Sequence, residues 1–306
     1  MEFGKLPSLD GVDFTLPPDP PENELVLNGR TPATPPRIYL GATGYNMKPW
    51  VGHWYPAGAK ERDFVRFYGQ QFNTIEHNTT HYRIPDTATV GRWREEVPAD
   101  FRYCPKVPQS LSHARDLGVH SPELPLFCDM IAGLEDRLGC CFLQVSPYFS
   151  PQNLPVLERF LDKWPREIPL AVEVRHEDFF RPTAAAGRYF ALLSAAGAAA
   201  VITDVAGRRD VCHMHLTNAL TMVRFVGNGL HPSDYARIDE WAQRLSAWFE
   251  KGLQAAYFFT HEPDNLLAPE LAAYAAGRFR EAIPGLETRG PKPPVPPAQQ
   301  TSLFDI

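Results

Sequence analysis

The sequence has no long apolar run and few cysteines. No stretch approaches the roughly 18 apolar residues of a membrane-spanning helix, and no basic segment followed by an apolar one marks a secretory signal. The five cysteines form no Cys-x-x-Cys pair, which argues against a zinc knuckle, and Cys140 and Cys141 lie together in an apolar run. These absences predict a soluble, cytoplasmic protein with reduced, buried thiols and no membrane contact.

The chain also has no excess of positive charge. Its formal net charge is -6, so any contact with nucleic acid has to be local. Metal-binding motifs are missing too, because no His-Glu-x-x-His occurs. A divalent metal remains an open cofactor hypothesis, since oxygen and nitrogen donors are present. The candidate donors are Glu76, Glu173, Asp204, His176 and Glu262.

Apolar, β-rich runs alternate with helix-length segments through most of the 306 residues. This alternation predicts a (β/α)8 barrel, with an open doubly wound sheet as the alternative because the segment from Asp204 to Thr221 shows no convincing helix. The predicted strands are 38–43, 73–78, 101–106, 140–144, 170–175, 199–204, 221–225 and 255–260. The predicted helices are 61–71, 87–96, 124–138, 155–164, 183–196, 233–251 and 268–282.

Proline-rich segments flank this barrel on both sides. We expect residues 1–36 to form a flexible arm, residues 37–284 to form the barrel, and residues 285–306 to form a proline-rich linker and tail.

Polar residues end nearly every predicted strand. In the run 170–176, Glu173 and Arg175 share one face of the strand, which in a closed barrel points into the lumen. Barrel enzymes carry their active sites at the carboxyl ends of the strands, so we expect a polar pocket at that mouth.

The same residues resemble a known family. Gly-Ala-Thr-Gly-Tyr at 41–45, Phe-Asn-Thr-Ile-Glu-His-Asn-Thr-Thr-His-Tyr at 72–82 and Val-Glu-Val-Arg-His at 172–176 resemble successive blocks of the DUF72 (YecE-like) family. The resemblance implies a TIM barrel and no established reaction. His-Glu-Pro-Asp-Asn at 261–265 departs from the asparagine-rich turn usual in the family.

The resemblance also assigns a pocket of mixed charge. Such a pocket suits acid–base catalysis on an anionic substrate, or it is a set of internal ion pairs. The candidate catalytic residues are Glu76, Lys106, Glu173, Arg175, His176 and Asp204. The candidate substrate-binding residues are Asn78, Tyr82, His113, Gln144 and Arg224.

The tail ends in Gln300-Thr301-Ser302-Leu303-Phe304, which resembles the bacterial sliding-clamp-binding pentapeptide. Gln300, Leu303 and Phe304 would then bind the clamp, with two apolar anchors at a tethered chain end. The alternative is that the tail folds back onto the barrel.

Three functions remain open from the sequence. The first is a hydrolase acting on a phosphate-containing substrate, including DNA in repair, recruited by the clamp. The second is an isomerase, lyase or hydrolase for a sugar or sugar phosphate, and the third is a non-catalytic adaptor that binds a ligand or the clamp.

Overall fold

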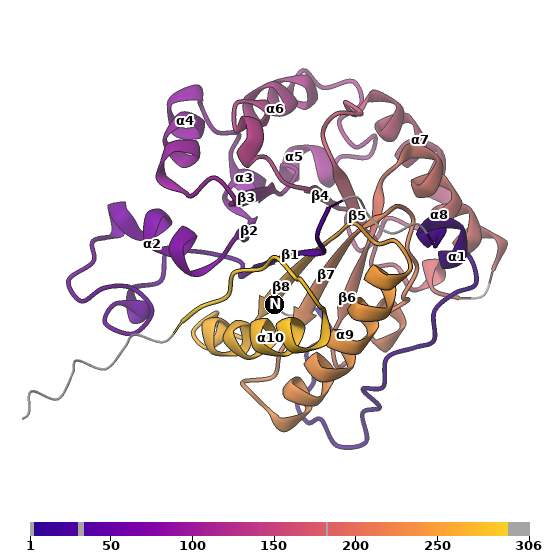
Figure 1. Cartoon of the computed structure of the whole chain (residues 1–306). Helices are drawn as coiled ribbons and strands as arrows, with labels where there is room; N and C mark the ends of the chain where they lie inside the picture. The colour runs from indigo at the N-terminus through magenta and orange to yellow at the C-terminus, as the bar shows by residue number, and fades with distance from the viewer. Residues whose placement is uncertain (1–2, 30–33, 182, 293–306) are drawn as a thin grey trace, which may run out of the picture.

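The computed structural model describes residues 3–29, 34–181 and 183–292. In this part of the chain, strands alternate with helices that surround them (Figure 1). The strands are β1 (Arg37–Gly41), β2 (Thr74–His77), β3 (Arg102–Pro105), β4 (Cys141–Gln144), β5 (Leu170–Glu173), β6 (Ala199–Asp204), β7 (Leu220–Val226) and β8 (Ala255–His261). The α-helices are α1 (Asn23–Leu27), α2 (Phe64–Gln71), α3 (Thr79–Tyr82), α4 (Thr87–Glu96), α5 (Gln109–Ser112), α6 (Glu123–Ala132), α7 (Leu154–Lys163), α8 (Ala184–Ala196), α9 (Pro232–Glu250) and α10 (Ala268–Ala282).

The strands close into a parallel barrel. Six of them pair in the order β1-β8-β7-β6-β5-β4, and β2 pairs with β3. Backbone hydrogen bonds join these two groups at both junctions: Glu76 N donates to Ala42 O at 3.1 Å, and Val107 N donates to Phe142 O at 3.0 Å. The (β/α)8 prediction is therefore confirmed, and the open sheet is not formed.

The connection between β6 and β7 is the irregular one. Its helical structure is a single short 3-10 helix, η6 (Arg209–Val211). Further short 3-10 helices are η1 (Lys48–Trp50), η2 (Glu61–Asp63), η3 (Glu135–Arg137), η4 (Pro151–Asn153) and η5 (Glu177–Phe179). The missing helix leaves one side of the barrel open to other parts of the chain.

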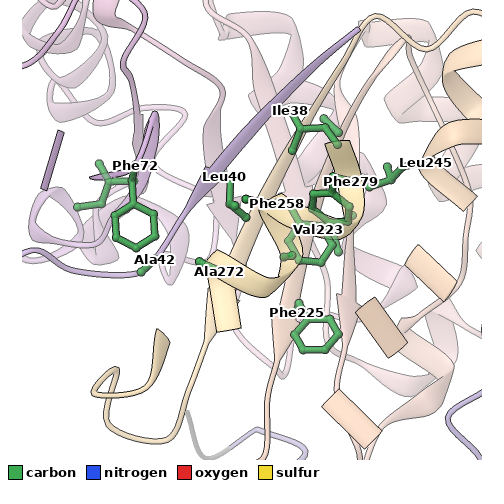
Figure 2. Close-up of a cluster of buried hydrophobic side chains, with 14 of the residues drawn as sticks. Ile38, Leu40, Ala42, Phe72, Val223, Phe225, Leu245, Phe258, Ala272 and Phe279 are labelled. Atoms are coloured by element: carbon green, nitrogen blue, oxygen red, sulfur yellow. The ribbon is translucent and has the colours of Figure 1, made fainter. Parts of the chain in front are cut away.

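Each strand divides its side chains between two cores, because successive residues face opposite sides. Outward-facing Leu40, Val223 and Phe258 pack against α9 and α10 (Figure 2). Inward-facing Tyr39 and Tyr257 stack in the lumen with ring centroids 4.6 Å apart. The five cysteines are buried and free, as predicted. Within the described residues, no helix combines the length and hydropathy needed to cross a bilayer.

The N-terminal segment differs from the expected flexible arm, because residues 3–29 pack on the barrel. Asp19 accepts hydrogen bonds from Arg244 and Trp248 of α9, at 2.6 and 2.9 Å. The Asn23 amide donates to Met214 O and accepts from Leu216 N, both at 2.8 Å. These bonds hold the segment against α9 and the open β6–β7 side. At the other end of the chain, the residues of the predicted clamp motif lie outside the described part.

Candidate functional site

Two buried carboxylates and one arginine form the centre of the barrel mouth. Glu76, Glu173 and Arg224 occupy inward-facing positions near the carboxyl ends of β2, β5 and β7. Arg224 donates from Nε and Nη2 to the two oxygens of Glu76, at 2.8 and 2.9 Å, and from Nη1 to Glu173 Oε2 at 2.7 Å. A planar guanidinium suits this forked geometry, so Arg224 bridges both carboxylates.

Residues from neighbouring strands extend this centre. His261 Nε2 lies 2.9 Å from Glu76 Oε2, and Arg175 Nε donates to Glu173 Oε1 at 3.1 Å. Gln144 Oε1 accepts from both Lys106 Nζ, at 3.2 Å, and Arg175 Nη2, at 3.0 Å. We call the connected set the mouth network. Its members are Glu76, Lys106, Gln144, Glu173, Arg175, Arg224 and His261.

Both carboxylates of the mouth network are ionised. Burial alone would raise the pKa of Glu76, but the charge of Arg224, helped by the hydrogen bond of His261, outweighs burial and holds that pKa well below its usual range. Burial likewise opposes the charges of Arg175 and Arg224 at Glu173, and the pKa of Glu173 is lowered overall. Carboxylates held in this way are weak bases and serve better to fix the arginines in place.

Lys106 is the cation of the mouth network for which the described residues provide no carboxylate partner. Its side chain is buried, and among the described residues its ammonium bonds only the neutral Gln144 side chain and lies over the Phe142 ring, 5.6 Å from the centroid. Burial, followed by the charge of Arg224, lowers the pKa of Lys106 to about 8. A buried ammonium without a counterion is a candidate site for an anion.

Asp204 lies outside the mouth network, which differs from the expected catalytic role. The inward residue at the end of β6 is Thr203, whose hydroxyl lies 3.3 Å from Glu173 Oε1. Asp204 faces outward, where its carboxylate accepts from Arg237 Nη1 at 3.0 Å and Trp241 Nε1 at 2.8 Å, and also pairs with Arg209. These contacts tie β6 to α9.

Four other predicted residues occupy the rim of the barrel. Asn78 donates to Glu76 Oε1 at 3.1 Å and therefore touches the mouth network. His113 is exposed at the end of α5, where its Nδ1 lies 3.0 Å from the Ser112 hydroxyl, and Tyr82 is 79% exposed on α3. His176 caps η5, with its Nδ1 accepting from Asp178 N at 3.3 Å. The structure thus gathers part of the predicted set and leaves Tyr82 and His176 apart.

His261 is the member of the mouth network that the predicted site omits. It follows Tyr257 and Phe259 at the two-residue spacing of one strand face, so the alternation along β8 is the signal that identifies it.

The proposed metal donors are not gathered into one cluster. Within the described ranges, no three histidine, cysteine or acidic side chains lie together in a way that could hold a metal ion. The carboxylates of Glu76 and Glu173 bond Arg224 instead, and Asp204 bonds Arg237. The donor set of the sequence therefore gains no support from the geometry.

A closed parallel barrel with a charged cluster at the carboxyl ends of its strands has the architecture of the TIM-barrel proteins. Within this class the chain belongs to the DUF72 family, because the family model described as "Protein of unknown function DUF72" matches residues 39–299. The predicted family is therefore confirmed, and its function is unknown.

The chain is similar to proteins from several bacteria. It is 31% identical over 285 residues to the UPF0759 protein YecE of Escherichia coli strain K12, covering 87% of this chain and 100% of that protein. A DUF72 family protein structure from Enterococcus faecalis V583 matches with TM-score 0.62 and 19% identity, covering 79% of this chain and 96% of that one. One from Thermotoga maritima MSB8 matches with TM-score 0.57 and 22% identity, covering 80% and 98%. These structures support the fold alone.

Proposed function

We propose that this protein is an enzyme that performs proton transfer on a small phosphate-bearing molecule at the mouth network. The observation that carries this proposal is Lys106, a buried ammonium whose described hydrogen-bond partner is a neutral amide. A phosphate oxygen would supply the missing negative charge. Arg175 lies beside Lys106 through Gln144, so two cationic side chains face the same position.

In the mouth network, some side chains hold Arg224 in place and others can transfer protons. Glu76 and Glu173 hold Arg224 by three hydrogen bonds, so its charge is preorganised and no reorientation is needed when an anion binds. Lys106, with its pKa near 8, can give up or take a proton close to neutral pH. Burial and the charges of Lys106 and Arg175 lower the pKa of His113, which favours its neutral, proton-accepting form.

The first experiment compares phosphate binding by the wild type and the Lys106→Met variant, using isothermal titration calorimetry. We expect the wild type to bind inorganic phosphate, the variant to lose that binding, and wild-type affinity to fall as the pH rises through about 8, where Lys106 loses its charge. Lys163→Met, an exposed lysine on α7, is the matched control and should bind as the wild type does. Equal phosphate binding by the wild type and Lys106→Met would refute the assignment.

The clamp-like motif at residues 300–304 motivates a second proposal, action on DNA after recruitment to a bacterial sliding clamp. Its support is the sequence of the tail, because Gln300, Leu303 and Phe304 lie outside the described residues. The test is binding of full-length protein to purified clamp, compared with a Leu303→Ala, Phe304→Ala double variant. Loss of binding in the double variant supports recruitment, and no binding by either protein rejects it.

A further inference from the structure

A cavity of about 290 Å³ adjoins the mouth network. Residues 4–9 of the N-terminal segment form one wall, and the carboxyl ends of β6, β7 and β8 form the other. The second wall includes Asn228, His261 and Glu262. Because His261 also bonds Glu76, the cavity and the mouth network share a side chain. The volume is near the lower end of the range for ligand pockets, about 300–1,000 Å³, so it suits a small molecule.

Glu262 is the polar group that the cavity leaves unsatisfied. The residue is 4% exposed, and its Oε2 accepts a hydrogen bond from Gly229 N at 2.8 Å. Its Oε1 is buried and has no hydrogen-bond partner among the described residues. A Cβ at Gly227 would lie 2.2 Å from this oxygen, so only glycine leaves room for the carboxyl group here. An unsatisfied buried oxygen is costly, and Glu262 lines the cavity, so a hydroxyl group of a bound ligand would supply the missing partner after a small shift of the carboxyl group.

The N-terminal wall of the cavity is held by a close backbone contact. Gly207 N donates to Gly4 O at 2.8 Å, and a Cβ at Gly207 would lie 2.7 Å from that same oxygen. Phe3 covers Arg175, whose guanidinium carbon lies 4.4 Å from the ring centroid. Residues 3–9 precede residue 39, where the family match begins. This wall therefore lies outside the residues that the family model matches, and it reaches from Arg175 to the cavity.

We propose that the cavity binds the hydroxyl-bearing part of the substrate, which makes the substrate class a small sugar phosphate or polyol phosphate. This inference rests on the proposed function, which places the phosphate on Lys106 and Arg175. A hydroxyl group fits Glu262 in either protonation state, because it can donate to the carboxylate or accept from the carboxylic acid. Burial raises the pKa of Glu262 to about 7 against the opposing effect of the Gly229 hydrogen bond, so both states are present near neutral pH. A second anion would fit only the protonated state.

The test is isothermal titration calorimetry of the full-length protein with three probes: inorganic phosphate, ribose and ribose 5-phosphate. We expect the wild type to bind ribose 5-phosphate at least tenfold more tightly than phosphate. Glu262→Met, which removes the acceptor, should bind ribose 5-phosphate about tenfold more weakly than the wild type does. Its affinity for inorganic phosphate should be unchanged. Glu262→Gln should keep most of the gain, because the amide still forms a hydrogen bond with a hydroxyl group. Glu158→Met, at an exposed site on α7, is the control for the substitution itself.

The outcomes separate the two proposals. If phosphate binds but the sugar adds no affinity, or if Glu262→Met keeps the whole gain, the inference is refuted and the proposed function stands. If Lys106→Met leaves phosphate binding unchanged while ribose binding still depends on Glu262, the cavity is a ligand site and the proposed function fails. Should Glu262→Met not fold, Gly227→Ala displaces the same carboxyl group and should show the same loss.

Discussion

Lys106 and Glu262 are buried at the barrel mouth without the opposite charge that usually accompanies such groups. Among the described residues neither forms an ion pair, and their pKa values move toward neutrality, to about 8 and about 7. The cause is the same for both, since burial disfavours the charged form of each side chain. A protein evolving only for stability would replace such residues, so their presence at one mouth supports a functional role.

Replacing Glu262 should change how stability depends on pH. The pKa of Glu262 is about 7 in the folded state, against its ordinary value of 4.5, so the folded state holds this proton more tightly than the unfolded state. Stability from this group is therefore complete below about pH 4.5 and is lost as the pH rises through 7, on the order of 3 kcal/mol in total. Glu262→Gln stays neutral and should escape this loss.

Urea unfolding of the wild type and Glu262→Gln at pH 5 and pH 8 measures the difference. We expect similar unfolding free energies at pH 5 and a clear advantage for the variant at pH 8. An advantage of the same size at both pH values would mean that Glu262 is ionised throughout and that its folded pKa is not raised.

At the scale of elements, Asp204 at the end of β6 joins this strand to α9. Asp204 is fully buried between Arg237 and Trp241 of α9, and removing its charge leaves the fully buried Arg237 with Asp234 alone as a charged partner. Breaking a buried ion pair costs roughly 3–5 kcal/mol, so Asp204→Asn should lower the unfolding free energy by about 3 kcal/mol. Phosphate affinity should stay within twofold of the wild type, because no mouth group changes.

Chemical denaturation measures the unfolding free energy, and calorimetry on the same protein samples measures the phosphate affinity. The matched variant is Thr203→Val, one position earlier on the opposite face, which removes a bond to Glu173 and should cost less stability. If Asp204→Asn weakens phosphate binding tenfold while keeping its stability, Asp204 acts in the site as the strand-end pattern suggests.

The position of Asp204 shows which features of the site the strand patterns predict and which they do not. The alternation of apolar, β-rich runs with helix-length segments was sufficient to predict the barrel. The two-residue period of a strand placed Glu173 and Arg175 on the lumen side. The same period along β6 puts Thr203 inward, so the strand-end criterion alone misplaced Asp204. The position of His176 depends on where β5 ends, and β5 ends at Glu173, which leaves His176 free to cap η5. Loop geometry of this kind is not encoded in periodicity.

At the scale of the whole molecule, the N-terminal segment was the least predictable part. Its proline-rich composition indicates an extended chain but not the surface on which that chain lies. The surface is chosen by single contacts that are remote in sequence, such as Asp19 with Arg244 and Asn23 with Leu216. The amino-acid composition of the segment does not predict such pairs. The barrel, by contrast, is specified by many repeated signals, so a few ambiguous elements do not obscure it.

The segment's position over the mouth should depend on Gly207. In Gly207→Ala the new Cβ would approach Gly4 O to 2.7 Å, so the carbonyl group has to move and the hydrogen bond from residue 207 is lost. We expect faster amide hydrogen exchange at residue 207 and faster tryptic cleavage after Lys5, with no change in the exchange of α9. Ribose 5-phosphate should also bind more weakly than to the wild type, since one wall of the cavity is displaced.

Gly187→Ala provides the matched control, because a Cβ at this position of α8 meets nothing within 4 Å. Alanine is also favoured over glycine within a helix by up to about 1 kcal/mol, so this variant should be slightly more stable and should keep the cleavage rate of the wild type. Unchanged cleavage and exchange in Gly207→Ala would show that the segment does not depend on the glycine contact. In that case other contacts, such as the bonds of Asp19 and Asn23 and that of Leu16 N with Glu240, would hold it on the barrel, and the wall over the cavity would be a consequence of that anchoring.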